Sequence, residues 1–77
     1  MVNVYATDAT SHCSFRAYID RDNEPVTNFL KSVCIWGDFD HEINGYIGFE
    51  ITDELFESVI DILEKRFDCM KDDSILT

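Results

Sequence analysis

Proline and glycine are scarce in this chain of 77 residues, which has one proline and three glycines. Flexible linkers are rich in glycine, serine or proline, so little of the sequence is suited to a linker. A second hydrophobic core would also find too little apolar surface at this length. We therefore expect a single acidic domain over residues 1–77, with a loosely ordered tail at 71–77.

Long hydrophobic runs are absent as well. The longest apolar run is Val33-Cys34-Ile35-Trp36, whereas a membrane-spanning helix needs about 20 apolar residues. The N-terminus has neither the basic start nor the apolar block of a signal peptide. We therefore expect a cytoplasmic protein that does not enter a membrane.

Cysteines are few, odd in number and widely separated: Cys13, Cys34 and Cys69. No C-x-x-C pair exists, so the sequence indicates neither a zinc site nor a redox motif. A secreted domain of this size usually needs paired disulfides. We expect reduced and mostly buried thiols.

Basic residues are also scarce. Six lysines and arginines face sixteen acids, which gives a net charge of −10. Such an excess repels nucleic acid and anionic membranes and favours basic protein partners. The sequence contains no Gly-rich phosphate loop, no G-x-S-x-G and no H-E-x-x-H. We therefore expect no enzyme activity and no cofactor.

Alternation of apolar and polar residues predicts strands at 2–6 and 13–19, the second with Phe15, Ala17 and Ile19 on its buried face. Pro25 is suited to the first position of a short helix at 25–32. The residues after Thr52 have helical periodicity to Cys69, and Thr52 is a good N-cap. These features predict an α+β fold. Its small antiparallel sheet of about four strands packs against one long C-terminal amphipathic helix, with a second short helix.

The Asn44-Gly45 pair predicts a hairpin, and its register decides which side chains share a face. A two-residue turn would pair Ile43 with Tyr46 and mix carboxylates with core residues. A three-residue loop with a bulge at Gly45 pairs Glu42 with Tyr46 instead, and we favour it. The acidic face of the hairpin would then hold Asp38, Asp40, Glu42, Tyr46 and Glu50.

Acidic residues also follow one side of the C-terminal helix, within roughly 100° of arc and over about 22 Å. These residues are Asp53, Glu54, Glu57, Asp61, Glu64 and Asp68. Their spacing is close to that of phosphates along one DNA strand, about 3.4 Å. A solvated helix with an acidic bias has the same pattern. Tyr46 and Trp36 are the aromatic residues we expect to anchor a partner beside this charge.

A different interpretation applies to Asp40-His41-Glu42-Ile43-Asn44-Gly45-Tyr46-Ile47. This segment resembles the first eight positions of an EF-hand calcium loop. The resemblance implies that Asp40, Glu42 and Asn44 are calcium ligands. Position twelve, which requires a glutamate, is Ile51 here, so the match is incomplete.

Three functions remain open from the sequence. The first is a small inhibitor that binds a basic, nucleic-acid-handling protein or enzyme complex through a DNA-mimicking acidic surface. In size and charge the chain is similar to the acidic anti-restriction and anti-CRISPR inhibitors of bacteriophages. The second is an immunity-type protein or small subunit that binds through a few buried contacts. The third is a calcium-binding module.

Overall fold

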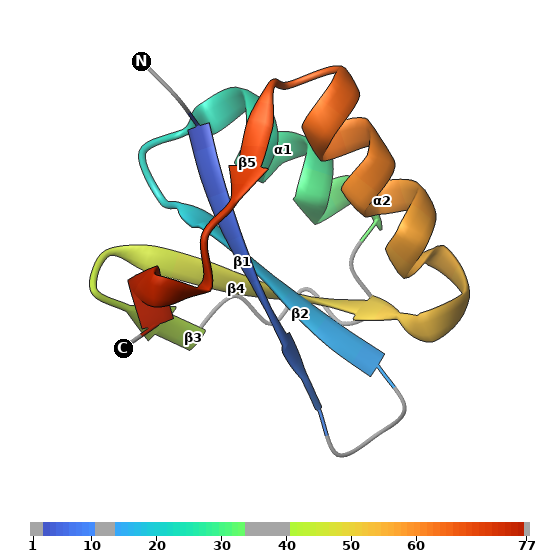
Figure 1. Cartoon of the computed structure of the whole chain (residues 1–77), viewed down its shortest axis with the longest axis horizontal. Helices are drawn as coiled ribbons and strands as arrows, with labels where there is room; N and C mark the ends of the chain where they lie inside the picture. Colours follow the sequence, from blue (N-terminus) through green and yellow to red (C-terminus); the bar gives the residue numbers. More distant parts are fainter. Residues whose placement is uncertain (1–2, 11–13, 34–40, 77) are drawn as a thin grey trace.

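The computed structural model describes residues 3–10, 14–33 and 41–76. Its elements in chain order are β1 (Asn3–Ala9), β2 (Ser14–Asp20), α1 (Glu24–Val33), β3 (His41–Ile43), β4 (Tyr46–Thr52), α2 (Asp53–Lys65), β5 (Cys69–Lys71) and a short 3-10 helix, η1 (Asp73–Leu76). The strands form one five-stranded sheet in the order β3-β4-β2-β1-β5 (Figure 1). The predicted α+β class is confirmed. The sheet is mixed, because β5 runs parallel to β1 while the other pairs are antiparallel.

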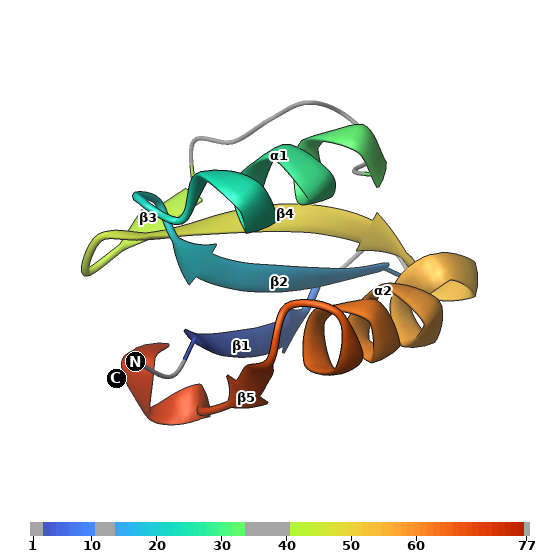
Figure 2. The ribbon, with the colours of Figure 1, turned by 90° about the horizontal axis from the view of Figure 1, so that it is seen from above.

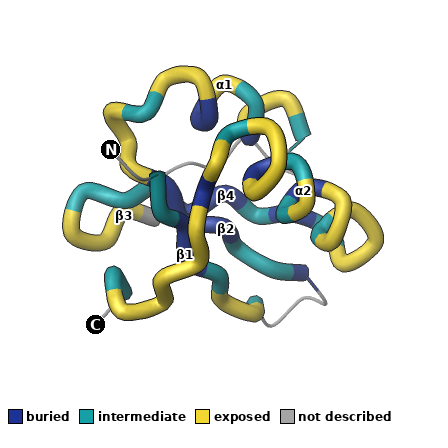
Figure 3. Tube along the Cα trace, turned by 45° about the horizontal axis from the view of Figure 1, so that its top comes forward, coloured by how far each residue is buried: buried dark blue, intermediate teal, exposed yellow. Residues whose placement is uncertain are grey.

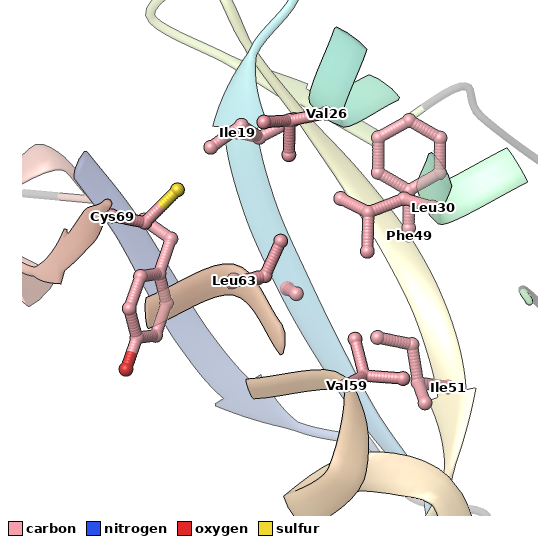
Figure 4. Close-up of a cluster of buried hydrophobic side chains, with 10 residues drawn as sticks. Ile19, Val26, Leu30, Phe49, Ile51, Val59, Leu63 and Cys69 are labelled. Carbon is pink, nitrogen blue, oxygen red and sulfur yellow. The ribbon is translucent and has the colours of Figure 1, made fainter. Parts of the chain in front are cut away.

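Both α-helices lie on one face of the sheet (Figure 2). The face they cover carries the predicted alternation of β2, in which Ala17 and Ile19 are fully buried. The two helices contribute Val26, Leu30, Val59 and Leu63 to the same core (Figure 4), and Figure 3 shows buried positions on both helices and on the sheet. Burying a side chain of this size contributes about 1.5–3 kcal/mol, so this face holds most of the stabilising apolar contacts.

The predicted start of the C-terminal helix is confirmed, and the short helix begins at Glu24, one residue before the predicted position. Thr52 Oγ1 accepts a hydrogen bond from Leu55 N at 3.3 Å, which makes Thr52 the N-cap of α2. At α1, Asn23 Oδ1 accepts from Val26 N at 3.4 Å. Each side-chain oxygen satisfies a backbone N–H that has no partner within its helix.

The register predicted for the hairpin is wrong. Asn44 and Gly45 have φ angles of 54° and 84°, so both are left-handed and form a two-residue turn. This turn pairs Ile43 with Tyr46. Asn-Gly favours such a turn because its twist matches that of the flanking strands. Glu42 therefore shares a face with Ile47, where its carboxylate pairs with Arg21 Nη1 at 3.1 Å instead of entering the core.

The predicted end of the C-terminal helix is also wrong. Helix α2 stops at Lys65, and Asp68 adopts a left-handed φ of 56°. The chain then turns back and places Cys69 in β5, where this cysteine is 4% exposed. Asn3 Nδ2 donates to Phe67 O at 3.0 Å and holds this turn. The chain thus leaves α2 about one turn before the predicted end and instead buries Cys69 in β5, beside β1.

Hydrogen bonds join the described part of the tail, residues 71–76, to the rest of the fold. Asp72 N donates to Tyr5 O at 2.8 Å, and Thr7 N donates to Asp73 Oδ1 at 3.1 Å. At the other end of η1, Asn44 Nδ2 donates to Ile75 O at 3.4 Å. The segment thus connects β1 to the turn between β3 and β4.

Candidate functional site

Helix α2 carries the largest group of exposed acids on one element. Its positions relative to the core follow from 100° of rotation per residue. Val59 and Leu63 are buried, and five exposed acids occupy an arc of about 100° on the solvent side. We call these residues the α2 acidic face: Asp53, Glu54, Glu57, Asp61 and Glu64. The face extends over about 16 Å of helix.

The C-terminal half of this face has partners within the molecule. Asp61 Oδ1 lies 3.0 Å from Lys65 Nζ, in a pair that is mostly exposed. Glu64 Oε2 accepts a hydrogen bond of 2.7 Å from the hydroxyl of Tyr5. Burial raises the pKa of Tyr5 far above its usual range, and the hydrogen bond to Glu64 and the negative charge of that residue raise it further. Tyr5 therefore remains a neutral donor at any physiological pH.

The N-terminal half differs. Among the described residues, no cation forms an ion pair with Asp53, Glu54 or Glu57. The positive end of the helix dipole favours acidic residues in the first turn, where Asp53 and Glu54 lie, and all three side chains are exposed. This half of the face is the part best suited to an external cation.

The sixth acid predicted for this stripe, Asp68, does not lie on the helix. It occupies the left-handed position between α2 and β5, and its side chain is exposed. Its negative charge, like that of Glu64, adds to the effect of burial in raising the pKa of the Cys69 thiol. Cys69 is a free, buried thiol as expected, whereas Cys13 and Cys34 lie outside the described residues.

The two predicted hairpin acids that the structure describes, Glu42 and Glu50, lie on opposite faces of the sheet. Glu42 lies on the helix side of the sheet, opposite Ile47. Glu50 lies on the other side, since the flanking Phe49 and Ile51 are in the core, and it accepts a hydrogen bond of 2.7 Å from Ser14 Oγ. The predicted anchor Tyr46 is half-buried on that same far side. Trp36, Asp38 and Asp40 lie outside the described residues.

The calcium-loop interpretation does not fit the fold. An EF-hand loop joins two helices, whereas residues 41–47 belong to β3, β4 and the tight turn between them. Within the described ranges, no group of three or more His, Cys, Asp or Glu side chains is placed to hold a metal ion. The acids that resemble calcium ligands thus belong to a segment that forms β3, β4 and their turn where the structure describes it.

Sequence reasoning missed the outer edge of β1. The strand was predicted at 2–6 but extends to Ala9, and Asp73 occupies part of its edge. A usable signal was Asp72-Asp73-Ser74, a pattern typical of a side-chain turn. Ser74 N does donate to Asp72 Oδ1 at 3.1 Å.

The described helices are all too short or too polar to cross a bilayer. Comparison of the chain with protein-family models, with curated proteins and with solved structures gives no match.

Proposed function

We propose that this protein is a small acidic inhibitor that occupies the basic groove of a nucleic-acid-handling protein. The observation that carries the proposal is the α2 acidic face, whose carboxylates at Asp53, Glu54 and Glu57 are exposed and have no cationic partner among the described residues. A surface of this kind attracts lysine and arginine side chains.

The spacing of the carboxylates supports nucleic-acid mimicry. The five acids, of which Asp61 is paired with Lys65, are on average about 4 Å apart along the helix, against about 3.4 Å between phosphates on one DNA strand. A groove that binds phosphates through lysines and arginines would meet charges at a similar density on α2.

The rigidity of α2 also supports this function. The helix is capped by Thr52 and held to the sheet by Val59 and Leu63, which are 3% and 0% exposed. Its backbone is thus ordered before a partner arrives, which reduces the entropy lost on binding. Inhibition then needs no chemistry, because the bound helix excludes the nucleic acid from the groove.

Affinity capture from extract of the native host, followed by elution with a salt gradient, tests the proposal. We expect basic DNA- or RNA-handling proteins to be retained at low salt and released as salt rises, because surface charges are screened over about 8 Å at physiological ionic strength. Competition with DNA or RNA for the captured protein then tests occupancy of the groove.

A pair of matched variants locates the surface. The double variant Glu54→Gln/Glu57→Gln removes two charges from the α2 acidic face. Asp22→Asn/Glu24→Gln removes two exposed charges near the start of α1, at the opposite end of the sheet. We expect the first variant alone to lose capture. Equal capture by both variants, resistant to salt, would instead support the immunity-type or subunit function and contradict nucleic-acid mimicry.

A further inference from the structure

Strand β1 continues beyond the strand that covers its outer edge. Strand β5 pairs with Asn3–Tyr5 only, while β1 runs on to Ala9. No other strand of the described chain lies on this side of β1, as its place in the sheet order shows (Figure 1). Asp8 and Ala9 are both exposed there.

Three hydrogen bonds define which backbone groups point outward. Tyr5 O accepts from Asp72 N and Thr7 N donates to Asp73 Oδ1, both on the outer side. Thr10 N donates to Ser14 O, toward the β2 side. Since backbone groups alternate along a strand, Thr7 and Ala9 face outward while Asp8 faces β2.

The carboxylate of Asp73 therefore occupies the position that a neighbouring strand's carbonyl would take at Thr7 N–H. Beyond it, the C=O of Thr7 and the N–H and C=O of Ala9 point outward, with no partner from the described residues. A row of unpaired backbone groups on an exposed edge is a template for another strand.

Helix α2 packs on β2, β4 and β5 and runs in roughly the opposite direction to β1 (Figure 1). Glu64 is fixed above the start of the edge by the hydroxyl of Tyr5. Farther along, Phe56 stacks on Phe15 with ring centroids 4.2 Å apart, and Phe15 is the cross-strand partner of Ala9. Glu57, two helical turns before Glu64, lies on the same side of α2.

We propose that the edge of β1 from Thr7 to Ala9 accepts an extended, basic segment of the partner as an added strand. This inference rests on the proposed function and specifies how the partner binds. Side chains of the added strand would alternate between the α2 acidic face, at Glu57 and Glu64, and the far side of the sheet, at Asp8. A second copy of this chain fits poorly, because each copy carries a charge of −10.

The spacing of the two carboxylates suits long basic side chains. Glu57 and Glu64 are seven residues apart, about 10.5 Å along the helix, whereas side chains on one face of a strand repeat every 6.8 Å or so. Two successive lysines or arginines of the added strand would thus be about 3.7 Å closer together than the two carboxylates, a difference that their long, flexible side chains can span.

The test uses a synthetic ten-residue peptide of alternating lysine and valine, titrated calorimetrically into the full chain at low salt. The matched control peptide has the same side chains but is methylated on its backbone nitrogens, so that it cannot donate to an edge. We expect the control to bind at least about tenfold more weakly, because at least two backbone hydrogen bonds are lost. We also expect only the unmodified peptide to slow hydrogen exchange of the Ala9 amide.

Two protein variants provide the second arm. Ala9→Pro removes the outward N–H at an edge position that tolerates proline, and Ala9→Val keeps it; thermal unfolding verifies that both fold. We expect the unmodified and the methylated peptide to bind the proline variant with equal affinity, and the valine variant to keep the difference in affinity between them.

The outcomes separate this inference from the proposed function. If both peptides bind equally and Glu54→Gln/Glu57→Gln weakens both, the added strand is wrong and the acidic surface stands. If the unmodified peptide binds through Ala9 but is unaffected by that double variant, the acidic surface is wrong. Absence of binding by either peptide overturns both.

Discussion

Tyr18 and Gly48 are cross-strand partners on β2 and β4, and the tyrosine ring lies directly over the glycine. A Cβ atom on Gly48 would lie 2.7 Å from Tyr18 Cε1. Tyr18 is only 2% exposed although it lies on the sheet face away from the helices, since its neighbours Ala17 and Ile19 face the core. Glycine inside a strand often marks such a close approach, and here it lets an aromatic ring cover the second face of the sheet.

Replacement of this glycine tests the contact. We expect Gly48→Ala to lower the free energy of unfolding by about 1–3 kcal/mol, because the new methyl group displaces the ring. Urea denaturation measures the change. In a Tyr18→Ala background the obstructing atoms are absent, so the same substitution should cost much less. An equal cost in both backgrounds would contradict the contact.

Local signals were sufficient to predict the parts of the fold that depend on neighbouring residues. The alternation of Phe15, Ala17 and Ile19 predicted a half-buried strand, Thr52 predicted the start of α2, and Pro25 predicted the start of α1 to within one residue. The exposed acids of the α2 acidic face followed from helical periodicity alone. In each case the residues that indicate a strand or a helix start lie in that element or directly beside it.

Features that depend on distant partners were not predictable in this way. Strand β5 has three residues and pairs with β1, more than sixty positions earlier in the chain, so no pattern identifies it. The predicted hairpin register is wrong because Glu42 forms an ion pair with Arg21. This pair allows the two-residue turn, which we had rejected because it places Glu42 on the same face as core residues. A shift of one residue moves every side chain of a strand to the other face, and it separates Glu42 from Glu50, the two described acids of the predicted acidic face.

The N-cap of α2 is a second test, because the acidic face depends on where this helix begins. Thr52→Ala removes the hydroxyl that accepts from Leu55 N, and we expect a loss of about 1 kcal/mol in the free energy of unfolding. Thr52→Ser keeps an accepting oxygen and should stay within a few tenths of a kcal/mol of the natural chain. Equal losses in both variants, measured by thermal or urea unfolding, would show that the cap contributes little.

Asp73 offers a test of how the tail covers β1. Asp73→Ala removes the acceptor of the Thr7 amide, so we expect hydrogen exchange at Thr7 to accelerate severalfold, equivalent to about 1 kcal/mol. Asp73→Asn retains a side-chain oxygen and should exchange more slowly than the alanine variant. The outward amide of Ala9 has no bond to Asp73 and serves as the internal reference in the same spectrum. Unchanged exchange at Thr7 in the alanine variant would place the tail elsewhere in solution.

The hydrogen bond from Tyr5 to Glu64 predicts how stability depends on pH. Burial is the main cause that raises the pKa of Tyr5, and its bond to Glu64 contributes further. In the unfolded chain tyrosine ionises near pH 10 or so, so the folded state retains the proton to higher pH. The resulting stabilisation is complete below about pH 10 and is lost as the pH rises toward the folded value.

Tyr5→Phe separates this effect from general alkaline unfolding. At neutral pH we expect the variant to be less stable by roughly 1 kcal/mol, because the hydrogen bond is lost. Phenylalanine cannot ionise, so the difference should shrink once the pH exceeds about 10. Cys69, whose pKa is raised by burial and by nearby carboxylates, is present in both proteins, so comparing their urea unfolding curves over the same pH series largely cancels its contribution. A difference that stays constant from neutral to strongly alkaline pH would mean that Tyr5 ionises equally easily in the folded and unfolded chains, and that Glu64 is not held above the edge of β1.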